Sequence, residues 1–91
     1  MRWLAEVRVH LRPGIADPEG QTIASGLKSL GYADLDEVRT GKLMRLAFTA
    51  PDVDTARQQV DEMCQRLLAN PVMESYEYEV RADEVPGGDD L

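Results

Sequence analysis

The stretch RWLAEVRVHL, residues 2–11, alternates between apolar and polar side chains except at Leu4, and it constrains the fold more than any other part of the chain. The apolar positions are Trp3, Ala5, Val7, Val9 and Leu11, and the polar positions between them include Glu6, Arg8 and His10. Because successive side chains of a β-strand point to opposite faces, this pattern predicts a strand with one buried face. The chain is therefore expected to build a sheet whose other face is charged.

A helix is predicted directly after this strand, over residues 18–30. Asp17 followed by Pro18 matches a helix N-cap with proline at the first helical position. Apolar residues then recur at helical spacing, and Gly31 stands where a helix commonly ends in a left-handed conformation.

The remaining elements follow from the same two periodicities. They are two strands within residues 34–50 that meet at residues 40–42, a helix that starts after Asp52 and ends by Asn70 before Pro71, and a strand over residues 72–80.

This β-α-β-β-α-β order predicts an α+β, ferredoxin-like sandwich, with a four-stranded antiparallel sheet and both helices on one face. The other face would carry Glu6, Arg8, His10, Arg45, Glu77 and Glu79. We expect a single domain over residues 1–82, and a disordered acidic tail over residues 83–91.

Charge and composition exclude several classes of protein. The formal net charge of -7 disfavours nucleic-acid binding, because the ten basic residues are scattered along the chain. No apolar run approaches the ~20 residues of a membrane span, and no signal peptide precedes the first strand. The single cysteine, Cys64, excludes an internal disulfide and favours a reducing cytoplasm.

No catalytic, cofactor-binding or metal-ligating constellation is predicted. The sole histidine, His10, has outward-facing neighbours, and Cys64 is expected to be a buried, inert thiol. One Cys and one His cannot form a zinc site. Turn and capping roles are expected for the acidic residues Asp34, Asp36, Glu37, Asp52 and Asp54, whose spacing does not match a calcium loop.

The loop RPGIADPEG, residues 12–20, is unusually stiff, with two prolines and two glycines in nine positions. A phosphate cradle is the weaker interpretation, since Pro18 lacks an N–H donor and Asp17 and Glu19 are negatively charged. Two interpretations remain open. The loop is either a capped helix entry or a preformed surface that another protein contacts.

Four segments in register resemble the PurS family: LRPGIADPEG, LKSLGY, EVRTGK and CQRLLANPVMESYEYEV. The likeness covers about residues 2–81. This family comprises the small subunits of phosphoribosylformylglycinamidine synthase in organisms that divide the enzyme into three chains. The resemblance implies a role in the fourth step of de novo purine (IMP) synthesis. There formylglycinamide ribonucleotide, ATP and glutamine yield formylglycinamidine ribonucleotide, ADP, phosphate and glutamate.

The resemblance also implies partners for this chain. They are the large synthetase subunit, which binds nucleotide and substrate, and a glutaminase subunit that releases ammonia. A non-catalytic small subunit would assemble the two and support ammonia transfer between them. The residues that match family motifs, and are therefore candidates for docking, are Pro13, Gly14, Asp17, Pro18, Gly20, Arg39 and Lys42. Arg39 and Lys42 are equally candidates for lining a polar passage. Gly41 is expected to serve a hairpin turn.

Self-association is expected as well, as a dimer or a tetramer. The last predicted strand contains Tyr76 and Tyr78 and has no internal proline or glycine, so it is a template for pairing with another strand. The alternative function is a small-ligand-sensing regulatory module, because ferredoxin-like domains also bind amino acids at dimer interfaces. Fold alone supports that alternative.

Overall fold

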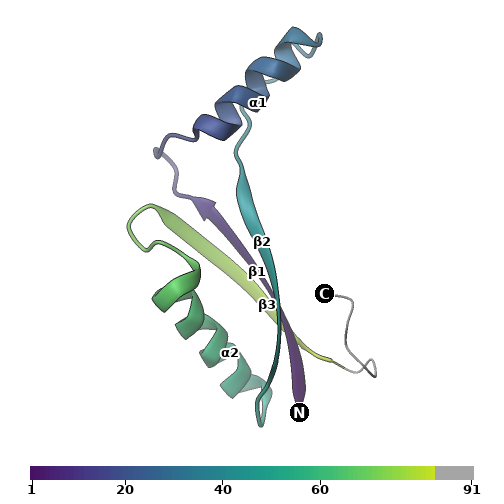
Figure 1. Cartoon of the computed structure of the whole chain (residues 1–91), viewed down its shortest axis with the longest axis vertical. Coiled ribbons are helices and arrows are strands. Elements are labelled where there is room, and N and C mark those ends of the chain that lie inside the picture. Colours follow the sequence, from purple (N-terminus) through teal and green to yellow (C-terminus); the bar gives the residue numbers. More distant parts are fainter. Residues whose placement is uncertain (84–91) are drawn as a thin grey trace.

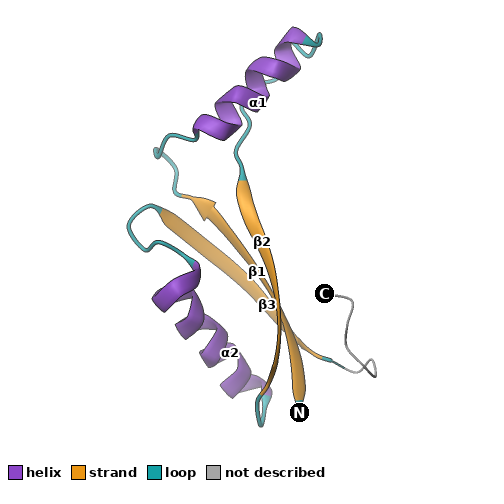
Figure 2. Ribbon diagram, in the orientation of Figure 1, coloured by secondary structure: helices purple, strands orange, loops and turns teal. Residues whose placement is uncertain are grey.

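The structure, a computed structural model, describes residues 1–83. Its elements are β1 (Arg2–Leu11), α1 (Pro18–Ser29), β2 (Gly41–Thr49), α2 (Val53–Met63), the π-helical turn η1 (Cys64–Leu68) and β3 (Glu74–Ala82) (Figures 1 and 2). The acidic tail expected to be disordered lies, apart from Asp83, outside the described residues.

The sheet has the order β2-β1-β3, and both neighbours of β1 are antiparallel to it. Val7 lies opposite Met44 on β2 and Tyr78 on β3, so the alternating apolar residues of all three strands share one face. We call this the inner face, and the charged face that contains Glu6 the outer face. The alternation of residues 2–11 therefore correctly predicted a strand with one buried and one charged face, and the structure places this strand at the centre of the sheet.

The core lies between the inner face and α2 (Figure 1). Val7 on β1 and Val60 on α2 have no exposed surface, and Cys64, where α2 passes into η1, is equally buried. A second apolar cluster surrounds Trp3, whose indole Nε1 donates a hydrogen bond to the Ala50 carbonyl at 3.0 Å. These contacts attach the β2-α2-β3 half of the chain to β1.

The fourth predicted strand is not formed within residues 1–83, where the sheet has three strands. Residues 35–40 have no regular secondary structure and lead directly into β2 without a hairpin turn. Acidic Asp34, Asp36 and Glu37 give this segment no apolar face to bury. The edge of β2 that faces away from β1 therefore has no neighbouring strand in the described chain.

The first helix also departs from the expected arrangement, in which both helices cover one face. α1 extends away from the end of the sheet at which β1 ends and β2 begins (Figure 1). Of its residues only Gly20 is buried, whereas the side chain of Ile23 is 40% exposed and that of Leu30, just beyond α1, is 76% exposed. Within one described chain, α1 therefore leaves its apolar stripe largely in solvent.

Candidate functional site

A groove of about 790 Å³ lies at the end of the sheet where α1 leaves it. We call it the end groove. Its lining comes from three places: the loop after β1 (Pro13, Gly14), the segment before β2 with the first residues of that strand (Glu37, Arg39, Thr40, Gly41, Lys42, Leu43), and the strands β1 and β3 (Glu6, Arg8, Val9, His10, Leu11, Glu77).

The end groove brings together two motifs that are far apart in the sequence. Pro13 and Gly14 form one wall, and Arg39 and Lys42 form the other. The first wall turns at Gly14, whose φ of 88° lies in the left-handed region that favours glycine. A hydrogen bond of 3.1 Å from the Ile15 N–H to the Arg12 carbonyl closes this turn. Four of the seven predicted docking residues therefore share one surface.

The groove contains both acidic and basic side chains, and its two basic motif residues, Arg39 and Lys42, are available to bind a partner. Arg39 donates to the carbonyl of Arg12 at 3.3 Å, and within residues 1–83 neither Arg39 nor Lys42 forms an ion pair. Arg8 is instead paired with Glu6 at 3.2 Å. A polar segment of another protein that carries carboxylates could bind to this wall.

Asp17 does not line the end groove; its carboxylate is used inside the chain. It accepts hydrogen bonds from the backbone N–H of Gly20 at 2.8 Å and of Thr40 at 2.6 Å, and from the Thr40 hydroxyl at 2.9 Å. The residue is only 2% exposed. These donors, first the Thr40 N–H and then that of Gly20, hold the pKa of Asp17 below its ordinary value.

Two glycines of the motifs permit close approach of the backbone. A Cβ on Gly20 would overlap the carbonyl oxygen of Val38, so α1 begins in direct contact with the segment before β2. A Cβ on Gly41 would lie 2.7 Å from the carbonyl oxygen of Val9. Gly41 therefore allows β2 to approach β1, and the expectation that it serves a hairpin turn was wrong. Pro18 is exposed at the first position of α1.

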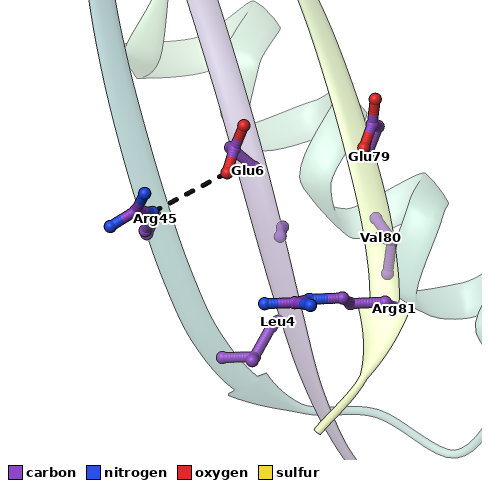
Figure 3. Close-up of a pocket in the computed structure, with 7 residues that line it drawn as sticks. Leu4, Glu6, Arg45, Glu79, Val80 and Arg81 are labelled. Atoms are coloured by element: carbon purple, nitrogen blue, oxygen red, sulfur yellow. Dashed lines mark ion pairs between the residues drawn. The ribbon is translucent and has the colours of Figure 1, made fainter. Parts of the chain in front are cut away.

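The outer face of the sheet has a second, smaller pocket of about 360 Å³ (Figure 3). In it Glu6 and Arg45 point toward one another, with 3.7 Å between the Arg45 Nε and a Glu6 oxygen. Arg81 extends from β3 toward Leu4, which is only 7% exposed although it belongs to the charged face. This pocket contains none of the predicted site residues.

The two residues with nucleophilic or acid–base chemistry are not placed together. Burial, and to a smaller extent the charge of Asp61, raises the pKa of the Cys64 thiol, which makes it a poor nucleophile at neutral pH. His10 lies on the outer face, with its Nδ1 3.3 Å from the Ser75 hydroxyl and its Nε2 3.5 Å from Glu77. In the part of the chain that is described, no group of acidic, His or Cys side chains could hold a metal ion.

Tyr76 and Tyr78, the predicted self-association residues, lie on the inner face. The Tyr76 hydroxyl donates to Asp61 of α2 at 2.8 Å, and the two rings stack with their centroids 6.2 Å apart. Their strand, β3, is an edge strand, as self-pairing requires. Self-association through these residues stays a prediction.

Thr40 is the site residue that sequence reasoning missed. It is the partner of Asp17, 23 positions away in the chain. Thr40 belongs to the EVRTGK segment, but neither that motif nor any periodicity indicates a contact with Asp17. The pair is visible only when the two segments are placed side by side.

Comparisons with known proteins agree on one family. The family model PurS, described as phosphoribosylformylglycinamidine (FGAM) synthase, matches residues 4–82. The PurS subunit of phosphoribosylformylglycinamidine synthase from Synechocystis sp. is 49% identical over 78 residues, which cover 86% of this chain and 78% of that protein.

Solved structures give the same result. PurS from Methanocaldococcus jannaschii, one of the subunits of formylglycinamide ribonucleotide amidotransferase, is similar with a TM-score of 0.79 and 36% identity, covering 90% of this chain and 99% of that one. A chain in the structure of PurLQS from Thermotoga maritima is similar with a TM-score of 0.81 and 30% identity, covering 89% and 99%. The chain described here belongs to the PurS family.

Proposed function

We propose that this chain is the non-catalytic small subunit of phosphoribosylformylglycinamidine synthase, in the fourth step of purine biosynthesis. It assembles the large synthetase subunit with the glutaminase subunit and supports ammonia transfer between them. The observation that carries this proposal is the family match over residues 4–82, together with the similarity to a chain of the PurLQS complex. The buried Cys64 thiol suits a reducing cytoplasm as the place of action.

The end groove is the proposed contact surface for the large synthetase subunit. It gathers Pro13, Gly14, Arg39 and Lys42, and the two basic side chains among them have no carboxylate partner within residues 1–83. The Pro13–Gly14 wall lies beside the basic side chains of Arg39 and Lys42, and the groove is open at the end of the sheet. An acidic segment of a partner protein therefore fits this groove better than a small metabolite does. Asp17 and Gly20 do not line this surface. Hydrogen bonds from the N–H groups of Gly20 and Thr40 to the Asp17 carboxylate hold the neighbouring segments in place.

Self-association would complete the four-stranded, two-helix unit that one chain does not form. The inner-face residues of β2, such as Leu46 and Phe48, are only partly buried, because α2 packs against β3. The exposed apolar stripe of α1 has the right chemistry to cover this half of the sheet in a second copy. The segment before β2 of that copy could then pair with the free β2 edge. A dimer of this kind is closed and symmetric.

The proposed function is tested by titrating the purified chain into the synthetase and glutaminase subunits while following glutamine-dependent product formation. Ammonia-dependent turnover by the large subunit is the control, because it needs no transfer from the glutaminase. We expect the glutamine-dependent rate to rise and saturate, and the ammonia-dependent rate to change little. A glutamine-dependent rate that is independent of the added chain contradicts the proposal.

The docking site is tested in the same titration with Arg39→Ala and Lys42→Ala. Each variant removes one cation from the groove wall and should raise the concentration of chain that gives half of the maximal rate. Arg57→Ala, a charge change on α2, is the matched control. Equal half-saturation for all four proteins would place the contact elsewhere.

A further inference from the structure

We propose that Asp17 is a positioning residue for partner docking, because it clamps the two walls of the end groove to one another. The clamp is the set of hydrogen bonds from Thr40 to the Asp17 carboxylate. The inference rests on the proposed function, since it concerns how the docking surface of that function keeps its shape.

The clamp lies where the two walls need a connection. The chain continues from the first wall, Pro13 and Gly14, to Asp17 just outside the groove, and Thr40 lies in the second wall. Among the described residues, the hydrogen bonds between residues 12–17 and 37–40 are those from Thr40 to Asp17 and the single bond from Arg39 to the Arg12 carbonyl. The Arg39 bond is long, at 3.3 Å, and exposed. Asp17 is therefore the main link between the walls.

The same carboxylate also sets the direction of α1. One Asp17 oxygen accepts the Gly20 N–H in the first turn of the helix, while the other accepts the Thr40 N–H. The start of α1 is thus fixed against the start of β2, in agreement with the close approach of Gly20 to the Val38 carbonyl. A hydrogen bond to a charged acceptor that is shielded from water is among the stronger hydrogen bonds in proteins.

Preorganisation is the physical reason why this clamp affects docking. A loop that is already held in its bound shape loses less conformational freedom when a partner binds. Without the clamp, Pro13 and Gly14 can move relative to Arg39, and binding must order them again. The side chains that touch the partner remain unchanged, so affinity falls while the rate of the assembled complex is preserved.

The experiment uses the same titration, with Asp17→Asn, Thr40→Val, the double variant and Thr40→Ser. Asn keeps the size of the side chain but loses the charge and one acceptor, and Val keeps the shape of Thr without its hydroxyl. The control is Asp52→Ala, which removes the corresponding N-cap of α2, a bond of 2.7 Å from the Thr55 N–H, without linking two segments. Circular dichroism at the assay temperature checks that each variant is folded.

We expect Asp17→Asn to raise the half-saturating concentration about tenfold, with an unchanged maximal rate. Thr40→Val loses the hydroxyl bonds but keeps the Thr40 N–H bond to Asp17, so it should raise the half-saturating concentration by a smaller factor. Thr40→Ser keeps a hydroxyl and should have the wild-type half-saturating concentration. The double variant should have the same half-saturating concentration as Asp17→Asn, because both substitutions act on the same link. Asp52→Ala should have no effect on half-saturation.

Wild-type half-saturation in folded Asp17→Asn would overturn the inference, as would a loss in Thr40→Val that adds fully to that of Asp17→Asn. If Arg39→Ala weakens docking while both clamp variants do not, the inference fails and the proposed function stands. If the wild-type chain has no effect on the glutamine-dependent rate, the proposed function fails and the inference fails with it.

Discussion

The hydroxyl of Tyr76 on β3 donates a hydrogen bond of 2.8 Å to the carboxylate of Asp61 on α2, and so ties the edge strand of the sheet to the helix that covers it. The pKa of Tyr76 is raised, first because the Asp61 carboxylate accepts a hydrogen bond from the protonated hydroxyl, and then because of burial. A side chain expected to mediate self-association therefore also holds one chain together.

Tyr76→Phe should lower the free energy of unfolding by roughly 1 kcal/mol, since it removes a partly buried hydrogen bond to a charged acceptor without leaving a cavity. Chemical denaturation at a fixed protein concentration measures this. Tyr32→Phe is the control, because the Tyr32 side chain is 63% exposed. Equal stability of wild type and Tyr76→Phe would show that the bond contributes nothing in solution.

Two glycines in the same helix should respond oppositely to alanine. Gly20→Ala should destabilise the protein, because the added Cβ would overlap the Val38 carbonyl oxygen. Gly26→Ala meets nothing within 4 Å and should stabilise α1 by up to about 1 kcal/mol, the difference in helix propensity. Thermal melts compare the two variants, and a stabilising Gly20→Ala would refute the close contact.

Cys64→Ala should leave the glutamine-dependent rate of the assembled complex close to that of wild type. The thiol is buried and its pKa is raised, so it is not available as a nucleophile. The variant should lose roughly 1–2 kcal/mol of stability through the small cavity. A thiol reagent should modify the native protein slowly and the denatured protein at once. Complete loss of activity in a folded, assembled variant would contradict this view.

Acid should destabilise the protein through its two capping carboxylates. The pKa of Asp17, lowered mainly by the Thr40 N–H, and that of Asp52, lowered mainly by the Thr55 N–H, both lie below the ordinary value of 3.8. Each carboxylate therefore contributes stability above pH 3.8 that is lost as the pH falls through the folded-state pKa. Denaturation curves at several pH values should show a shallower acid loss for Asp17→Asn. An unchanged slope would argue against the clamp.

Static light scattering should find a dimer or a tetramer at micromolar concentration. Ile23→Glu places a charge in the apolar stripe of α1 and should shift the protein toward the monomer. Gln21→Glu adds the same charge at an exposed polar position of the same helix and is the matched control. A monomeric wild-type chain, or an unaffected Ile23→Glu assembly, would rule out a role of this stripe in self-association.

Local patterns alone determined most of the secondary structure. The alternation in residues 2–11 reports which side chains share a face, a property of any strand, and β1 follows it from Arg2 to Leu11. Asp17 and Asp52 cap helices at their own positions, through bonds to an N–H three residues away. Both signals act over a few residues, so they can be recognised in the sequence.

Tertiary structure decided how these elements are placed. Residues 34–39 have the length of a strand, but a strand needs a partner. Their path beside α1 leaves one edge of β2 without a neighbouring strand in the described part of the chain. The direction of α1 depends on the hydrogen bonds between Asp17 and Thr40. The end groove depends on the placement of Pro13 and Arg39 around one cavity. Each of the last two pairings joins residues more than 20 positions apart. Such contacts depend on the packing of the whole chain, which neighbouring residues in the sequence do not reveal.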